Sequence, residues 1–413
     1  MISALKGGCA VKQRLRRIGD DWAIPAAILL VMLTAAMLTG QWPWTGNMYH
    51  SYTLQACSWL QGRLDLGQDY PWLELAIHEG RYYVSFPPFP SYVMLPFAAV
   101  FGTETPDGWI ALAVTLLGIC YAMRLYRALG GPERQMAFWV LFLYLGTGYL
   151  FISLNGWVWF IAQTMCFTLM LIALYASLKG HGGTALTCWA CAVGCRPMTA
   201  LYFPLLAYVL LRKLHSDRPE LTIPQLILRH LHWAIGPLLL AASYMTLNWL
   251  RFGDPLEFGH NYLPEFTRTP TGQFSLTYLA ENLTNLLRLP YVEDGRLVFY
   301  KINGNAFWLT NPLILIAAAA WCAALIRRRT SPVLLVMIPL LTAAYVFILC
   351  CHRTMGGWQF GCRYLLDVMP VLFFGLVLWM PRGDRFRRWC MPLLAFSAAL
   401  NVVGTVLLYN KWM

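Results

Sequence analysis

Apolar segments separated by short polar or basic connections recur along the whole of this chain. The first segment covers residues 22–40, about 19 residues, which is long enough for a helix to cross the hydrocarbon core of a bilayer. The later segments are 91–102, 109–129, 136–152, 156–178, 185–211, 233–250, 306–326, 333–351, 365–380 and 391–409. The series predicts an all-α integral membrane protein that forms a single multispan domain over residues 1–413.

The distribution of charge supports a membrane protein and argues against nucleic-acid binding. Only 12% of the residues are charged, whereas soluble domains carry about 25%. The net charge is +12, but the basic residues form short clusters between the apolar segments, as in the cytoplasmic connections of membrane proteins. We therefore expect a cytoplasmic N-terminus and no nucleic-acid partner. Most of the 12 cysteines lie inside apolar segments without a nearby His or carboxylate, so no metal site is predicted.

Two irregular segments allow every basic cluster to lie on the cytoplasmic side. Segment 91–102 is too short to span a bilayer, and segment 185–211 contains Arg196-Pro197, where a hinge would divide it into two short helices. With these adjustments we expect about 10 to 13 spans. Residues 41–90 then form a first extracytoplasmic loop that carries a surface helix at 48–60. Residues 251–305 form a second large loop, and 352–363 form a short third outer stretch.

Carboxylates in the first loop are candidates for a general base. Asp65, Asp69, Glu74 and Glu79 lie there, and Glu74 stands out because apolar residues flank it. Partial burial would raise the pKa of the Glu74 carboxyl and keep it near a reacting group. The alternative is that all four are solvated loop charges.

Arginines near the predicted outer face are candidates for binding an anionic headgroup. The candidates are Arg251, Arg353 and Arg363 near the outer ends of apolar segments, and Arg196 inside one. Arginines at segment ends can also snorkel to the interface, and Arg196 can instead form a salt bridge or cap a broken helix. Glu257 and His260, in the second loop, could bind a substrate hydroxyl or a metal.

Three motifs, in this order along the chain, resemble the bacterial GT-C membrane glycosyltransferases, a group that includes protein O-mannosyltransferase-like and aminoarabinose-transferase-like enzymes. The first is Gly80-Arg-Tyr-Tyr-Val-Ser-Phe-Pro-Pro-Phe-Pro90, followed by Pro96, in which Tyr82 and Tyr83 are candidate substrate-binding residues. The other two cover residues 251–259 and 358–370, and Cys195-Arg-Pro197 fits the same pattern.

The resemblance implies a polyprenyl-phosphate-linked sugar donor and inverting transfer to a lipid, glycan or protein acceptor at the outer face of a bacterial inner membrane. An acid in the first loop activates the acceptor. Residues 45–51 lack the Asp that the family often has there, so this role falls to Glu74 or Asp69. No cofactor is required, although some relatives use a divalent metal. The alternatives are a lipid-linked sugar flippase and a non-catalytic GT-C-like protein.

Overall fold

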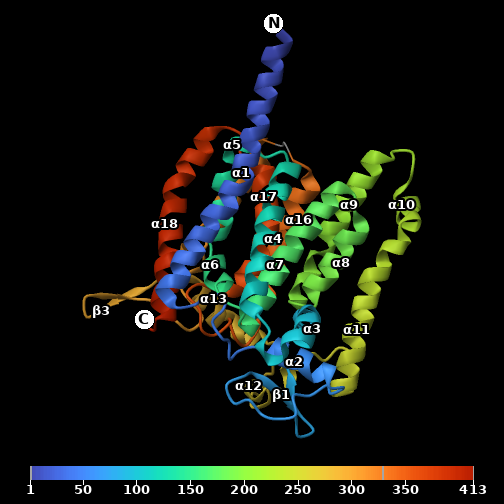
Figure 1. Ribbon diagram of the computed structural model, residues 1–413, viewed down its shortest axis with the longest axis vertical. Helices are drawn as coiled ribbons and strands as arrows, with labels where there is room; N and C mark the ends of the chain where they lie inside the picture. The colour runs from blue at the N-terminus through green and yellow to red at the C-terminus, as the bar shows by residue number, and fades with distance from the viewer. Residues whose placement is uncertain (1, 328–329, 413) are drawn as a thin grey trace.

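The computed structural model describes residues 2–327 and 330–412 as a bundle of helices with two small β-hairpins (Figure 1). Helices long and apolar enough to cross a membrane confirm an all-α membrane fold. Five helices in the described residues meet this criterion. They are residues Asp21–Thr39 of α1 (Ile2–Thr39), α4 (Asp107–Ala128), α7 (Val158–Lys179), α16 (Pro332–Cys350) and α18 (Asp384–Tyr409).

The remaining helices are shorter. They are α2 (Ser51–Leu60), α3 (Phe89–Phe101), α5 (Glu133–Leu145), α6 (Tyr149–Ser153), α8 (Gly182–Val193), α9 (Phe203–Asp217), α10 (Ile223–Arg229), α11 (Ile235–Phe252), α12 (Pro264–Thr267), α13 (Leu279–Leu287), α14 (Phe307–Thr310), α15 (Leu313–Arg327) and α17 (Met369–Trp379). The expectation of 10 to 13 spans exceeds the five single helices that qualify, because several apolar segments are broken. A further span arises if α10 and α11, with a 62° bend between them, cross together.

The predicted hinge in segment 185–211 is confirmed. Helix α8 ends at Val193, the 3₁₀ helix η2 covers Pro197–Tyr202, and α9 follows directly. Arg196 itself has an extended backbone, which is typical of a residue that precedes proline. The break therefore places the Arg196 side chain between two helices rather than on the face of one.

The three predicted extracytoplasmic stretches lie at the same end of the bundle (Figure 1). At this end Asp107, the first residue of α4, accepts a hydrogen bond of 2.7 Å from Asn47 Nδ2 in the first loop. At the other end of α4, Arg127 forms ion pairs with Asp21 and Glu133. One end of the bundle thus carries the loops and the other carries clustered charges.

The first loop contains α2 and a hairpin of β1 (Leu75–His78) and β2 (Arg81–Val84), in which Leu75 pairs with Val84. Glu79 and Gly80 form its turn with φ angles of 49° and 73°. We expected a helix at 48–60 on the membrane surface. In the structure most residues of α2 are buried, because the helix packs against α3 inside the protein.

The second and third stretches pair with each other. Isolated β-bridges join Phe274 to His352, Ile302 to Trp358 and Asn305 to Gly361. The second stretch also contains the 3₁₀ helices η4 (His260–Tyr262) and η5 (Leu276–Tyr278) and a hairpin of β3 (Tyr291–Glu293) and β4 (Arg296–Val298). The remaining 3₁₀ helices are η1 (Gly102–Glu104), η3 (Leu231–Ala234) and η6 (Arg363–Val368). Segments distant in sequence therefore meet at the loop end.

Candidate functional site

Two adjoining cavities of about 240 and 210 Å³ lie between the loops and the outer turns of the helices. Both are lined by the same six residues: Phe86, Trp159, His260, His352, Arg363 and Tyr364. We call them the first and the second cavity. The first extends to Arg196 and Glu257, and the second extends to Glu74 and Glu265. Residues from all three outer stretches thus contribute to one composite site.

Arg363 lies where the two cavities meet and is only 7% exposed. Its Nε and Nη2 donate to the carbonyl of Gly356 at 3.1 and 2.8 Å, and Nη1 lies 3.5 Å from the carbonyl of Trp159. No carboxylate lies within ion-pair distance of this guanidinium among the described residues. Its charge is therefore solvated by neutral groups and is available to an anion in the cavity.

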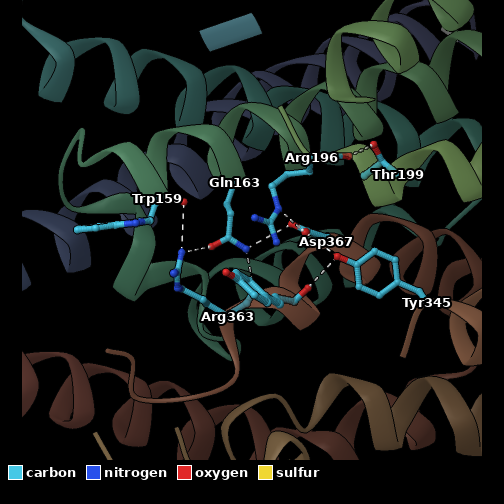
Figure 2. Close-up of polar contacts among 8 residues, drawn as sticks. Trp159, Gln163, Arg196, Thr199, Tyr345, Arg363 and Asp367 are labelled. Atoms are coloured by element: carbon cyan, nitrogen blue, oxygen red, sulfur yellow. Dashed lines mark hydrogen bonds and ion pairs between the residues drawn. The ribbon is translucent and has the colours of Figure 1, made fainter. Parts of the chain in front are cut away.

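Arg196 has a different environment, because its charge is paired. Its Nε donates to Asp367 at 2.8 Å, and the Asp367 side chain is 1% exposed (Figure 2). Tyr345 Oη donates to the same carboxylate at 2.7 Å. The guanidinium also lies 4.4 Å from the ring centroid of Tyr364. The pair joins the hinge before η2 to the helix η6 that Arg363 begins.

Gln163 of α7 connects the two arginines. Its Nε2 donates to the backbone carbonyl of Arg363 at 3.0 Å and lies 3.4 Å from Asp367, and its Oε1 lies 3.4 Å from Arg363 Nη1 (Figure 2). The side chain is fully buried. This amide fixes the position of η6 against the central helix α7, most of which is buried.

Glu74 precedes β1 and lines the second cavity, but the residue is exposed rather than partly buried as expected, because it lies at the open rim of the first loop. Its Oε2 accepts a hydrogen bond of 3.0 Å from the indole Nε1 of Trp159, which also lines this cavity. Ser85 Oγ donates to the Glu74 carbonyl at 3.0 Å, so the hairpin fixes the backbone here. The structure thus brings Glu74 and Arg363, from two separate loops, to the wall of one cavity.

Two further carboxylates border the cavities. Glu265 of α12 lines the second cavity, where burial and then the charge of Glu74 raise its pKa. Glu257 lines the first cavity, and its carboxylate accepts hydrogen bonds from the Gly259 amide at 2.5 Å and from Asn261 Nδ2 at 2.7 Å. Glu257 is thus occupied locally, whereas Glu74 and Glu265 face the same space.

Two histidines lie on the shared wall. Burial lowers the pKa of His260 to about 4 and also lowers the pKa of His352. His352 Nδ1 lies 2.8 Å from the Thr354 carbonyl, and its Nε2 lies 3.1 Å from Gln273 Nε2. Burial thus favours the neutral form of both imidazoles, so Arg363 is the main positive charge where the cavities meet.

Five predicted site residues, all within the described part of the chain, line neither cavity: Asp69, Tyr82, Tyr83, Arg251 and Arg353. Asp69 is exposed, and Tyr83 packs against Phe252 at a ring distance of 5.3 Å. Tyr82 packs against the small core of the first loop, and Arg353 bonds through its amide to the Gln273 carbonyl at 2.9 Å.

Arg251 is 3% exposed and has three local partners. Its Nη1 donates to the Val84 carbonyl at 3.1 Å, its Nη2 to Asn248 Oδ1 at 2.9 Å, and its Nε to the Leu247 carbonyl at 3.3 Å. These contacts join the end of α11 to the first loop. Arg251 thus holds the β-hairpin in place and lines neither cavity.

Sequence reasoning did not single out Trp159, Gln163, Glu265 and Asp367. Two of them carried a usable signal, because Gln163 and Asp367 are polar residues inside apolar segments, where such residues generally have a partner or a function. Trp159 and Glu265 carried no such signal. No group of three or more His, Cys, Asp or Glu side chains in the described ranges could hold a metal ion.

No known protein-family model matches the sequence, and no curated protein matches it either. Solved structures do match. ArnT from Cupriavidus metallidurans bound to undecaprenyl phosphate has a TM-score of 0.54 and 15% identity, over 94% of this chain and 76% of ArnT. The apo structure of the same protein gives a TM-score of 0.53 with 15% identity, over 94% and 77% of the two chains. The chain therefore shares the fold of ArnT, in agreement with the fold that its ordered motifs predict.

Proposed function

We propose that the protein is a membrane glycosyltransferase that moves a sugar from a polyprenyl-phosphate-linked donor to an acceptor at the loop end of the bundle. The observation that carries this proposal is the joint placement of Arg363 and Glu74 on one cavity wall. A buried cation without a carboxylate partner suits a phosphate, and a carboxylate in the same cavity suits a general base. The fold shared with ArnT, whose structure holds undecaprenyl phosphate, supports the same donor class.

Arg363 binds the donor phosphate in this proposal. Its guanidinium is held by backbone carbonyls and by Gln163, so it is oriented before the donor arrives. As the bond between sugar and phosphate breaks, negative charge develops on the phosphate, and a fixed cation stabilises it. Arg196 supports this region at the first cavity, although Asp367 already neutralises much of its charge.

Glu74 acts as the base. Its carboxylate takes the proton from an acceptor hydroxyl, the freed oxygen attacks the anomeric carbon, and the bond from that carbon to the phosphate oxygen breaks with inversion. The electron pair leaves with the polyprenyl phosphate. Trp159 holds the carboxylate by its indole N–H, which fixes one oxygen and leaves the other for the acceptor.

An apolar groove of about 540 Å³ offers a path for the prenyl chain. Residues of α13, α15, α16 and α17 line it, including Cys350 at the outer end of α16. Leu349, the preceding residue of α16, lines the first cavity. A lipid whose chain lies in this groove would therefore have its headgroup close to the cavities.

The protein spans a membrane several times, and we place it in a bacterial cytoplasmic membrane with a cytoplasmic N-terminus. The loop end then faces outward. The acceptor is a lipid, glycan or protein hydroxyl or amine that reaches the second cavity from outside. This reaction requires no cofactor, because a lipid phosphate is a good leaving group without a metal.

The test uses purified full-length protein in liposomes with radiolabelled undecaprenyl-phosphate-linked sugars and an envelope extract as acceptor. Glu74→Gln should lower transfer by about 10²- to 10⁴-fold, the usual contribution of a general base. The matched control is Asp69→Asn, an exposed first-loop acid outside both cavities, which should retain full transfer. Full activity of Glu74→Gln would remove the base assignment. Movement of the lipid across the bilayer without transfer would favour a flippase.

A further inference from the structure

The β3–β4 hairpin extends away from the body of the protein (Figure 1). Its register pairs Val292 with Leu297 and Glu293 with Arg296. Because side chains alternate between the faces of a strand, Val292 and Leu297 share one face. The other face carries the charged pair together with Tyr291 and Val298. Val292 is 70% exposed and Leu297 60% exposed. One face of the hairpin is thus wholly apolar, and the described part of the chain leaves most of it uncovered.

An isolated two-stranded hairpin is only marginally stable in water. Asp294 and Gly295 form its turn with φ angles of 50° and 72°, and no further strand extends the sheet in the described part of the chain. Packing of the apolar face against an apolar medium would supply the missing stabilisation.

The neighbouring helix α13 shows which medium that is. Its Asn282 and Asn285 are buried against the protein, and Asn282 Nδ2 donates to the carbonyls of Cys350 and His352 at 3.0 and 2.7 Å. Leu283 and Leu287, by contrast, point outward and are exposed. Leu286 is buried with the two asparagines, so the outward side of α13 carries Leu283 and Leu287 as its large apolar residues. Exposed leucines beside inward-facing amides suit a lipid environment, as in interfacial amphipathic helices.

The hairpin continues this lipid-facing surface. Leu283 lines the apolar groove beside α16, a helix that qualifies as a membrane span, so α13 lies against the membrane-crossing part of the bundle. The chain passes from α13 through exposed Leu289 directly into β3. We propose that α13 and the β3–β4 hairpin together form an anchor that inserts the apolar face of the hairpin into the outer-leaflet interface.

This contact is linked to the cavities through the chain that follows the hairpin. The Gln359 amide donates to the Lys301 carbonyl at 2.9 Å, and Ile302 bridges to Trp358, which lines the second cavity. A hairpin fixed on the bilayer therefore also fixes the strand that supports one cavity wall. The anchor does not depend on the reaction, and its test requires no substrate.

The test places a nitroxide at Val292→Cys and Leu297→Cys, with Glu293→Cys and Arg296→Cys as controls on the opposite face. The protein is full length, its exposed Cys120 and Cys322 are replaced by Ser, and it is reconstituted into phosphatidylethanolamine–phosphatidylglycerol liposomes. We expect nitroxides at 292 and 297 to collide with oxygen more often than with a water-soluble nickel chelate. The ratio of oxygen collisions to nickel-chelate collisions at these two positions should be several-fold above the same ratio at 293 and 296.

Equal ratios on the two faces, with free access of the nickel chelate to 292 and 297, would place the hairpin in water and overturn the proposal. Protection of the labels at 292 and 297 from both oxygen and the nickel chelate would show that protein covers these positions. That outcome would overturn the proposal of a lipid anchor as well. The labelled positions are all exposed, so the substitutions leave the packing of the bundle intact.

Discussion

Replacing Asp367 by Asn keeps the shape of the side chain but removes its charge. The carboxylate is 1% exposed and accepts hydrogen bonds from Arg196 at 2.8 Å and from Tyr345 at 2.7 Å. Removing one partner of a buried ion pair typically costs about 3–5 kcal/mol, because the other charge remains buried and uncompensated. The Arg196 side chain is 21% exposed and borders a cavity, so we expect the lower limit, about 3 kcal/mol.

The assay is the midpoint of unfolding in detergent, followed by intrinsic tryptophan fluorescence. Asp367→Asn should unfold well before the unmodified protein, and Arg196→Gln with Asp367→Asn should recover part of the loss, because no charge is then left unpaired. Unchanged stability of Asp367→Asn would show that the ion pair with Arg196 does not stabilise the fold. So would a double variant whose loss equals the sum of the two single losses.

Four further predictions concern the cavities. Arg363→Gln should weaken binding of undecaprenyl phosphate by about 1.5–3 kcal/mol, the range for hydrogen bonds to charged groups. An unchanged dissociation constant in titration calorimetry would contradict this. Trp159→Phe removes the indole N–H at Glu74 and should lower kcat/KM less than Glu74→Gln does; an equal or larger loss would argue against a positioning role. Glu265→Gln should change the pH dependence of transfer on the acid side, because burial raises the pKa of Glu265; an unaltered profile would exclude it from the titrating groups. Burial lowers the pKa of His260 from 6.5 to about 4, so the contribution of its neutral form to stability is complete above pH 6.5 and is lost as the pH falls toward 4. Over this pH range the Tm of His260→Gln should therefore fall less than the Tm of the unmodified protein, and an equal fall would contradict the prediction.

The sequence was sufficient to predict an all-α membrane bundle and its hinge, but not the number of spans or the burial of α2. The apolar segments predicted helices, and Pro197 predicted the hinge, since both follow from local chemistry. Periodicity and length could not predict whether a broken apolar segment crosses the membrane by itself or together with a neighbouring helix, because the path of such a segment depends on the helices packed beside it. The burial of α2 against α3 is a tertiary effect of the same kind.

The site was only partly predictable, for a physical reason. Arg251 and Arg363 look alike in sequence, since each lies next to an apolar segment and near glycines. In the structure Arg251 is bonded to Val84 and Asn248, whereas Arg363 reaches the cavities without an acidic partner. Such partners come from segments distant in the chain, and the ion pair of Arg196 with Asp367 has the same origin.

A structure determined with undecaprenyl phosphate in a lipid nanodisc is the most direct test of the composite site. We expect phosphate oxygens within hydrogen-bonding distance of the Arg363 guanidinium, where the two cavities meet, with Glu74 lining the same cavity. A phosphate bound away from Arg363, with this guanidinium still held only by Gly356, Trp159 and Gln163, would contradict this expectation.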